Sequence, residues 1–311
     1  MSSRIIQKYI NVNTKFRPYV KGEQAKSTDF LVSLPNPIRN VLSMKLKTFN
    51  APNAEYTFDI KENNNKFEII DVSAPNAPVA ITIPPGSYTS DQLKVNVNSA
   101  LTSAGFTNIQ LDYITPIPPP SGGLGMFAFK SVAAPALNQY EFNFDVNVNN
   151  YIYETFGWKL GFRKSYYSAN GEYQKNIPNQ NCPQKFGNVG GLSVFNGTTY
   201  YLADCPIAMP NTSTYYLLSI NDFLNQSDLT FHEACYPSNN IMDNIFARID
   251  TRYSQDSNTM YETDTGEPFK RVYSGPVTLN KFHIKLYDDN NNILDLNNAD
   301  YSFLLELEVK V

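Results

Sequence analysis

The sequence places strand patterns near both ends of the chain, and this constrains the fold more than any other feature. Residues 27–67 read as a short strand, a turn bounded by proline and a long second strand. Residues 302–311 form one unbroken strand pattern at the other end. A β-protein of this kind is expected to build both ends into its sheets. The sequence therefore predicts one closed β-sandwich.

Composition also favours an all-β fold. Charged residues make up only 17% of the chain, and neutral polar residues, above all 37 Asn, take their place. The aromatic residues are 21 Tyr and 20 Phe against a single Trp. Tyr and Phe favour pleated, half-buried surfaces, and Asn favours turns. These proportions predict many strands joined by polar loops.

Alternation and turn residues predict the individual strands. The expected strands are 30–34 (ended by Pro35 and Pro37), 41–49, 56–60, 67–70, 79–83, 109–114, 126–130, 140–148, 215–220, 245–249, 282–287 and 301–311. One helix is expected after Thr89, where Thr89 and Gln92 fit a capping box and Gly105 supplies the stop. Its single apolar face predicts that it covers an open end of a sheet.

Two loop regions are expected to make protein contacts. A projection at 115–125 carries three consecutive prolines, which are stiff and extended, followed by flexible glycines. From about residue 151 to 211 the chain is rich in Tyr, Asn, Gly and Ser and has little periodicity. Tyrosine gives a large amphipathic contact area at low entropy cost. The candidate contact residues in these loops are Pro118, Pro119, Pro120, Tyr166, Tyr167 and Tyr173.

Charge is distributed unevenly along the chain. The whole chain carries −4, but residues 1–28 carry +5 and the remainder about −9. The basic residues of this N-terminal arm are Arg4, Lys8, Lys15, Arg17, Lys21 and Lys26. A basic arm on an acidic body suits nucleic acid, an acidic membrane surface or an acidic neighbouring subunit, and the alternative is an arm that docks on its own domain. The acidic whole-chain balance does not favour sequence-specific nucleic-acid binding.

Cysteine usage and hydropathy give expectations about the compartment. Cys182, Cys205 and Cys235 are odd in number and widely spaced, which fits neither a disulfide framework nor a zinc site. We expect buried free thiols in a reducing compartment. The first residues have no hydrophobic signal core, and no run of about 18 apolar residues occurs. These features predict a soluble chain made in the cytosol.

No group of residues predicts catalysis, a metal site or a cofactor. His232, Glu233 and Cys235 lie close in sequence, but no further ligand is clustered with them. The segment that starts at Asp288 resembles a calcium loop, yet Ile293 stands where glycine is needed. A turn is the better interpretation of this segment. We therefore predict a protein that is not an enzyme.

Several short blocks, in a consistent order, resemble a family of structural proteins of large icosahedral double-stranded DNA viruses, the giant-virus and algal-virus assemblage. The match covers roughly residues 10–105 and 270–311. The blocks are 10–17 (INVNTKFR), 27–30 (STDF), 34–38 (LPNPI), 40–44 (NVLSM), Pro52 and Asn53 with Tyr56, 81–88 (ITIPPGSY) with the 89–104 helix, 273–276 (YSGP) and 302–308 (SFLLELE).

The resemblance implies a capsid protein of the virion, synthesised in the host cytoplasm, with a jelly-roll β-sandwich. Proteins of this family at the five-fold vertex (pentons) resemble single jelly rolls whose first and last strands lie side by side, with large insertions between inner strands. We expect a basic arm at 1–28, a jelly roll at 29–112 and 216–311, and a loop-rich insertion, or small β subdomain, at 113–215. The implied partners are copies of the chain in a homopentamer, the major and minor capsid proteins, and the inner viral membrane. The alternatives are a minor capsid cement protein and a jelly-roll receptor- or glycan-binding module.

Overall fold

The computed structural model divides the chain into two compact units. Unit 1 consists of Met1–Glu55 with Ser213–Val311, and unit 2 is Tyr56–Thr212. The structure describes residues 4–20, 23–73, 77–114, 125–133, 137–146, 151–167, 192–195, 198–205, 207, 213–224, 230–232, 241–251 and 270–311.

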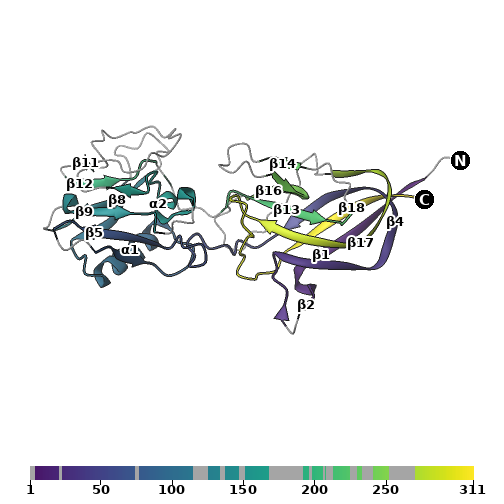
Figure 1. The fold of residues 1–311 in the computed structure, drawn as a ribbon, viewed down its shortest axis with the longest axis horizontal. Helices are drawn as coiled ribbons and strands as arrows, with labels where there is room; N and C mark the ends of the chain where they lie inside the picture. The colour runs from purple at the N-terminus through teal and green to yellow at the C-terminus, as the bar shows by residue number, and fades with distance from the viewer. Residues whose placement is uncertain are drawn as a thin grey trace. The chain divides into compact units, whose positions relative to one another are not determined.

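Unit 1 is built on a six-stranded antiparallel sheet (Figure 1). The order across the sheet is β1 (Ile5–Asn13), β18 (Ser302–Lys310), β4 (Asp29–Asn50), β17 (Lys270–Tyr287), β13 (Tyr215–Asn221) and β16 (Ile245–Asp250). Smaller elements are the 3₁₀ helix η1 (Thr14–Phe16) and two hairpins, β2 (Tyr19–Val20) with β3 (Glu23–Gln24) and β14 (Thr230–His232) with β15 (Ile241–Asp243).

Two of these strands, β4 and β17, are long and curved, and each changes partners along its length (Figure 1). Residues 41–50 of β4 pair with β18, and 43–45 pair with the start of β17. Residues 29–41 of β4 pair instead with 277–285 of β17, which also pairs with β13. The register therefore divides the sheet into two four-stranded halves.

Counting each half of β4 and of β17 separately gives eight strands in this sheet, which are numbered here in chain order. One half of the sheet then has the order 1-8-3-6 and the other the order 2-7-4-5. This winding is that of a jelly roll. The all-β class and the jelly roll predicted from the sequence are confirmed.

The prolines within β4 do not end it. The sequence predicted a break at Pro35 and Pro37, but the strand continues through both to Asn50. This part of β4 lies at an edge of its half of the sheet, where a missing N–H costs no ladder bond. Asn40 adopts a positive φ of 60°, and the register with β17 shifts between Val272 and Val277. Such irregularities bend paired strands, and a bent strand can form part of both halves of the sheet.

Glu55 connects the two points where the chain leaves and re-enters unit 1. Its buried carboxylate accepts hydrogen bonds from the backbone N–H of Ser213 at 3.2 Å and from the Ser213 hydroxyl at 2.6 Å. The Tyr216 hydroxyl donates to it at 3.3 Å. The inserted unit therefore begins and ends at neighbouring positions of the jelly roll, between β4 and β13.

Unit 2 is a second β-sandwich, and its described residues include two α-helices. One four-stranded sheet has the order β10 (Tyr166–Tyr167), β9 (Tyr140–Asn143), β5 (Lys66–Asp71) and β6 (Val79–Thr82). The other has the order β11 (Leu192–Phe195), β12 (Thr198–Leu202), β8 (Met126–Ser131) and β7 (Ile109–Ile114). The helical elements are α1 (Ser90–Ser103), α2 (Phe156–Lys159), η2 (Leu137–Gln139) and η3 (Ile152–Glu154).

Helix α1 forms as its sequence predicts. The Thr89 hydroxyl accepts from the Gln92 N–H at 3.3 Å, and the Gln92 side chain accepts from the Thr89 N–H at 3.0 Å. This capping box satisfies donors that a helix N-terminus otherwise leaves open. Leu93, Val97 and Leu101 on one face are buried in the core of unit 2. That core is rich in phenylalanine, and the rings of Phe129 and Phe142 stack at 4.5 Å.

Some predicted boundaries differ from the structure. The segment 56–60 contributes only an isolated bridge from Phe58 to Gly86, and the strand expected at 140–148 is shorter. The inserted unit starts at Tyr56, whereas the insertion expected from the sequence starts at 113. The reason is strand pairing, because β5 pairs with β9 and β7 pairs with β8, all within unit 2.

The prediction of three free thiols is wrong for Cys205, which is buried and disulfide-bonded. The other two cysteines lie outside the described residues. Wide spacing in the sequence gave no sign of this bridge, because the fold decides which cysteines meet.

Candidate functional site

The N-terminal segment is part of the jelly roll and does not extend away from it as an arm. Strand β1 pairs with β18 over its full length, from Ile5 opposite Lys310 to Asn13 opposite Ser302. Ile10 and Val12 are buried in the core of unit 1. Of the two alternatives for the arm, docking on its own domain is therefore the one found over residues 5–13.

Strand β1 leaves one edge open. It lies at the end of the sheet, and within the described residues its only partner is β18. Ile5 and Tyr9 project from the face opposite the core and are exposed, while Lys8 lies at the rim of the core-facing side. A strand edge offers a row of backbone donors and acceptors to another chain. This edge is a candidate surface for contact with a neighbouring subunit.

Two strongly exposed aromatic side chains follow β1 along the chain. Phe16 in η1 is 79% exposed and Tyr19 in β2 is 72% exposed. Aromatic side chains are enriched among the residues that dominate the binding energy of interfaces, so these two are candidate anchors. Neither residue is in the contact set predicted from the sequence, although aromatic residues interleaved with basic ones are a visible signal there. We call residues 4–26 the N-terminal contact segment.

Most of the predicted basic contact residues are accessible. Arg4, Lys8, Lys15 and Lys26 are exposed to solvent, and Lys21 lies outside the described residues. The side chains of Arg4, Lys8, Lys15 and Lys26 therefore remain candidates for contact with an acidic partner.

Arg17 is different, because its side chain is buried. Its guanidinium donates to the Ala25 carbonyl at 2.5 Å, to the Thr14 carbonyl at 2.8 Å and to the Asn298 side chain at 2.9 Å. It also forms an ion pair with Asp300. These bonds tie the segment after β1 to the loop before β18. Arg17 has a structural role within unit 1, and its place in the predicted contact set is corrected.

The predicted tyrosine contacts in unit 2 are also partly corrected. Tyr167 is buried, and its hydroxyl donates to Asp204, whose carboxylate also accepts from the Arg163 N–H at 2.8 Å. Tyr166 is half-buried, and its hydroxyl donates to Glu141. The short strand β10 alternates these two side chains, so one of them faces the core. Tyr173, Pro118, Pro119 and Pro120 lie outside the described residues.

Buried tyrosines predict a loss of stability at alkaline pH. Burial raises the pKa of Tyr167, Tyr273 and Tyr301 above the usual value of about 10. Between pH 10 and the raised pKa values, the unfolded chain loses these protons while the folded chain keeps them. The stabilisation is therefore complete below about pH 10 and is lost as the pH rises further. A spectroscopic titration should show one set of tyrosines ionising near the usual pKa and a second set ionising only as circular dichroism reports unfolding. Ionisation of every tyrosine in one step, with the fold intact, would contradict this.

Within the described residues, no group of three or more His, Cys, Asp and Glu side chains is placed to hold a metal ion. His283 contacts Asp29 at 2.7 Å on neighbouring strands, without a further ligand among the described side chains. The Asp288 carboxylate accepts from the backbone N–H groups of Asn290 and Asn292, which is the predicted turn. The His232 side chain lies outside the described part of the structure.

The described part of the chain has no helix with the length and apolar character needed to cross a membrane.

Comparison with known proteins gives little at the level of sequence. No protein-family model matches the chain, and no curated protein matches it. Among solved structures, the chain is similar to the crystal structure of the mavirus penton protein, with 10% identity, full coverage of both chains and a TM-score of 0.39. A TM-score this low does not establish a common fold, so the jelly-roll assignment rests on the strand register alone.

Proposed function

We propose that this chain is a structural protein of an icosahedral double-stranded DNA virus and forms the pentameric vertex of its capsid. One observation carries the proposal. Strands β1 and β18 pair side by side in a jelly roll, and a large unit is inserted between the inner strands β4 and β13. The sequence blocks that resemble viral capsid proteins imply this same arrangement for vertex proteins.

Assembly then follows from surfaces at the N-terminal end of unit 1. A ring needs a heterologous contact, in which one surface of each copy meets a different surface of the next. The N-terminal contact segment offers an open strand edge, exposed Phe16 and Tyr19, and basic side chains. The rest of the chain carries the opposite charge. Opposite charges favour contact between the segment of one copy and the body of its neighbour, and added salt should weaken this contact.

The mass of the purified full-length protein tests the proposal. Native mass spectrometry and light scattering should give five times the chain mass of 35.1 kDa. Replacing Phe16 and Tyr19 together by serine should raise the concentration at which the ring dissociates by about tenfold or more, because each exposed aromatic is a candidate interface anchor. The matched control is Tyr56→Ser, an exposed aromatic of unit 2.

Other outcomes would contradict the proposal. A single monomeric species at all concentrations, with no incorporation into particles, would exclude the vertex assignment. A trimer or monomer that binds glycans would favour the receptor-binding jelly roll. A pentamer insensitive to the Phe16 and Tyr19 substitutions would retain the vertex assignment but exclude the N-terminal contact segment as its contact surface.

A further inference from the structure

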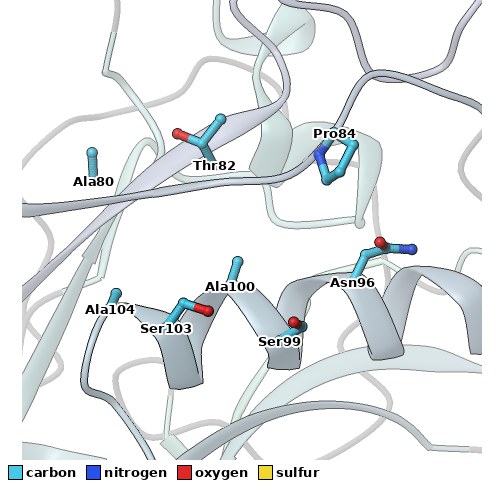
Figure 2. Close-up of a pocket in the computed structure, with 8 residues that line it drawn as sticks. All are labelled: Ala80, Thr82, Pro84, Asn96, Ser99, Ala100, Ser103 and Ala104. Carbon is cyan, nitrogen blue, oxygen red and sulfur yellow. The ribbon is translucent and has the colours of Figure 1, made fainter.

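Unit 2 has a groove that runs along one of its sheet edges. It has a volume of about 460 Å³ and lies between β6 and α1 (Figure 2). Four of its lining residues come from α1 and a fifth, Ala104, is the C-cap of that helix, which Figure 2 shows facing the strand. The lining residues are Ala80, Thr82, Pro84, Asn96, Ser99, Ala100, Ser103 and Ala104.

Within the described residues, the strand side of the groove carries backbone groups that no other strand pairs with. Strand β6 ends its sheet, with β5 as its only partner within the described part of unit 2. The Ile83 N–H donates to the Asn65 carbonyl at 3.0 Å, on the β5 side. Because backbone groups alternate along an antiparallel strand, those of Ile81 also face β5, whereas those of Ala80 and Thr82 point away. Ala80 and Thr82 are two of the residues that line the groove.

We propose that this groove binds a single extended segment of another polypeptide, which adds to β6 as a further strand. The N–H and C=O groups of Ala80 and Thr82 alternate along the edge. An extended backbone matches this pattern, as in other cases of β-strand addition. The inference concerns unit 2 and does not depend on the proposed capsid function.

The helix side of the groove determines what kind of segment fits. None of the lining residues is charged, and the only charged residues of α1, Asp91 and Lys94, pair with each other at 3.0 Å in its first turns. An uncharged segment therefore enters without leaving a charge unpaired. Small side chains at Ser99, Ala100 and Ser103 leave room for small or β-branched side chains of the incoming strand.

Helix α1 also favours a single segment over a second copy of this chain as the occupant of the groove. Helix α1 bounds the groove on the side opposite β6 (Figure 2). The β6 edge of a second copy has its own α1 beside it, and the two helices would meet before the strands could pair. A lone extended segment has no such obstacle. It is therefore the occupant that the groove fits.

Hydrogen exchange of individual amides tests the proposal directly. The probe is the uncharged peptide acetyl-TVTVT-amide, added at about 1 mM, a range in which weak complexes are populated. Binding should slow exchange at Ala80 and Thr82, whose N–H groups point into the groove. Exchange at Ile81 and Ile83 should stay unchanged, because these amides already face β5. The peptide acetyl-TVPVT-amide, in which proline removes a donor and disturbs the strand, should bind more weakly.

Variants in and near the groove distinguish peptide binding in this groove from binding elsewhere on the protein. Ser103→Trp should fill the groove and abolish saturable binding, whereas Thr102→Trp, on an exposed helix position that does not line the groove, should not. Thr82→Pro should weaken binding about fivefold, because it removes one outward donor but no bond to β5. Amide exchange where β5 pairs with β9 checks that unit 2 stays folded, since fluorescence of Trp158 would overlap with that of the added tryptophan.

Three results would overturn the proposal. The first is no change in exchange at Ala80 and Thr82 at saturating peptide. The second is an equal loss of binding in Ser103→Trp and Thr102→Trp. The third is slower exchange at Ala80 and Thr82 that depends on protein concentration without peptide, which would assign the edge to a second copy.

Discussion

Replacing Asp222 by alanine is expected to lower the free energy of unfolding of unit 1 by about 3–5 kcal/mol. Asp222 forms an ion pair with Arg271 at 2.9 Å, and both side chains are buried, with 2% of the Arg271 side chain exposed. Arg271 also donates to the Ile220 carbonyl at 2.9 Å, and the Tyr273 hydroxyl donates to Asp222 at 2.8 Å. Removing the carboxylate leaves a guanidinium in the interior with no compensating charge, which is the costly half of breaking a buried pair.

The position of this network explains why its loss should affect the jelly roll as a whole. Arg271 and Tyr273 lie on β17 just before the strand crosses from one half of the sheet to the other. Ile220 lies at the end of β13, which belongs to the second half, and Asp222 directly follows that strand. The buried pair therefore joins the two halves near the bend in β17.

Hydrogen exchange at Leu305 and Leu307 of β18 measures the opening of unit 1. Trp158, the single tryptophan, lies in unit 2, so its fluorescence reports on the other unit. The matched control is Asp250→Ala, which removes an exposed carboxylate paired with Arg248 at 3.2 Å. That change should cost no more than about 1 kcal/mol, because solvent screens exposed pairs. Equal effects of the two substitutions would contradict the role given to Asp222.

The all-β class could be predicted because its signals are local, whereas the jelly roll was implied by the resemblance to viral capsid proteins. Strand alternation near both ends of the chain correctly predicted strands that are found in β4 and β18, and the capping box at Thr89 correctly predicted α1. The partner change within β4 and β17 could not be predicted, because it depends on the positive φ of Asn40 and on the register shift between Val272 and Val277, which arise from pairing. The same holds for the start of unit 2, since residues 56–112 join whichever sheet their strands pair with.

The charge of the N-terminal contact segment could be predicted from the sequence, but the burial of its individual side chains could not. Six basic residues near the N-terminus are visible in the sequence, yet nothing local distinguishes the buried Arg17 from the exposed Lys15. The difference comes from Asn298 and Asp300, almost 300 residues away in the chain. Tyr167 is a similar case, because its partner Asp204 belongs to a distant strand end. Residues whose role depends on long-range partners are those that composition misassigns.

Replacing Arg17 by alanine is expected to lower the free energy of unfolding of unit 1 by about 3 kcal/mol, the low end of the range for broken buried pairs. The guanidinium supplies hydrogen bonds to Ala25, Thr14 and Asn298 and an ion pair to Asp300. The loss is smaller than for Asp222 because the partner left behind, Asp300, is half exposed and can be rehydrated. Hydrogen exchange at the start of β18 should report the change first, since Thr14 donates its backbone N–H to Tyr301 at 2.9 Å.

Substitutions of the neighbouring lysines distinguish a structural role of Arg17 from a role in assembly. Lys15→Ala and Lys26→Ala remove exposed side chains and should change the free energy of unfolding by no more than about 0.5 kcal/mol. If the N-terminal contact segment meets acidic neighbours, the pair Lys15→Glu and Lys26→Glu should weaken assembly at low salt while exchange in β18 stays normal. Arg17→Ala should show the opposite order, with faster exchange in β18 even at concentrations where the protein is monomeric. Normal exchange in Arg17→Ala together with lost assembly would return Arg17 to the contact surface.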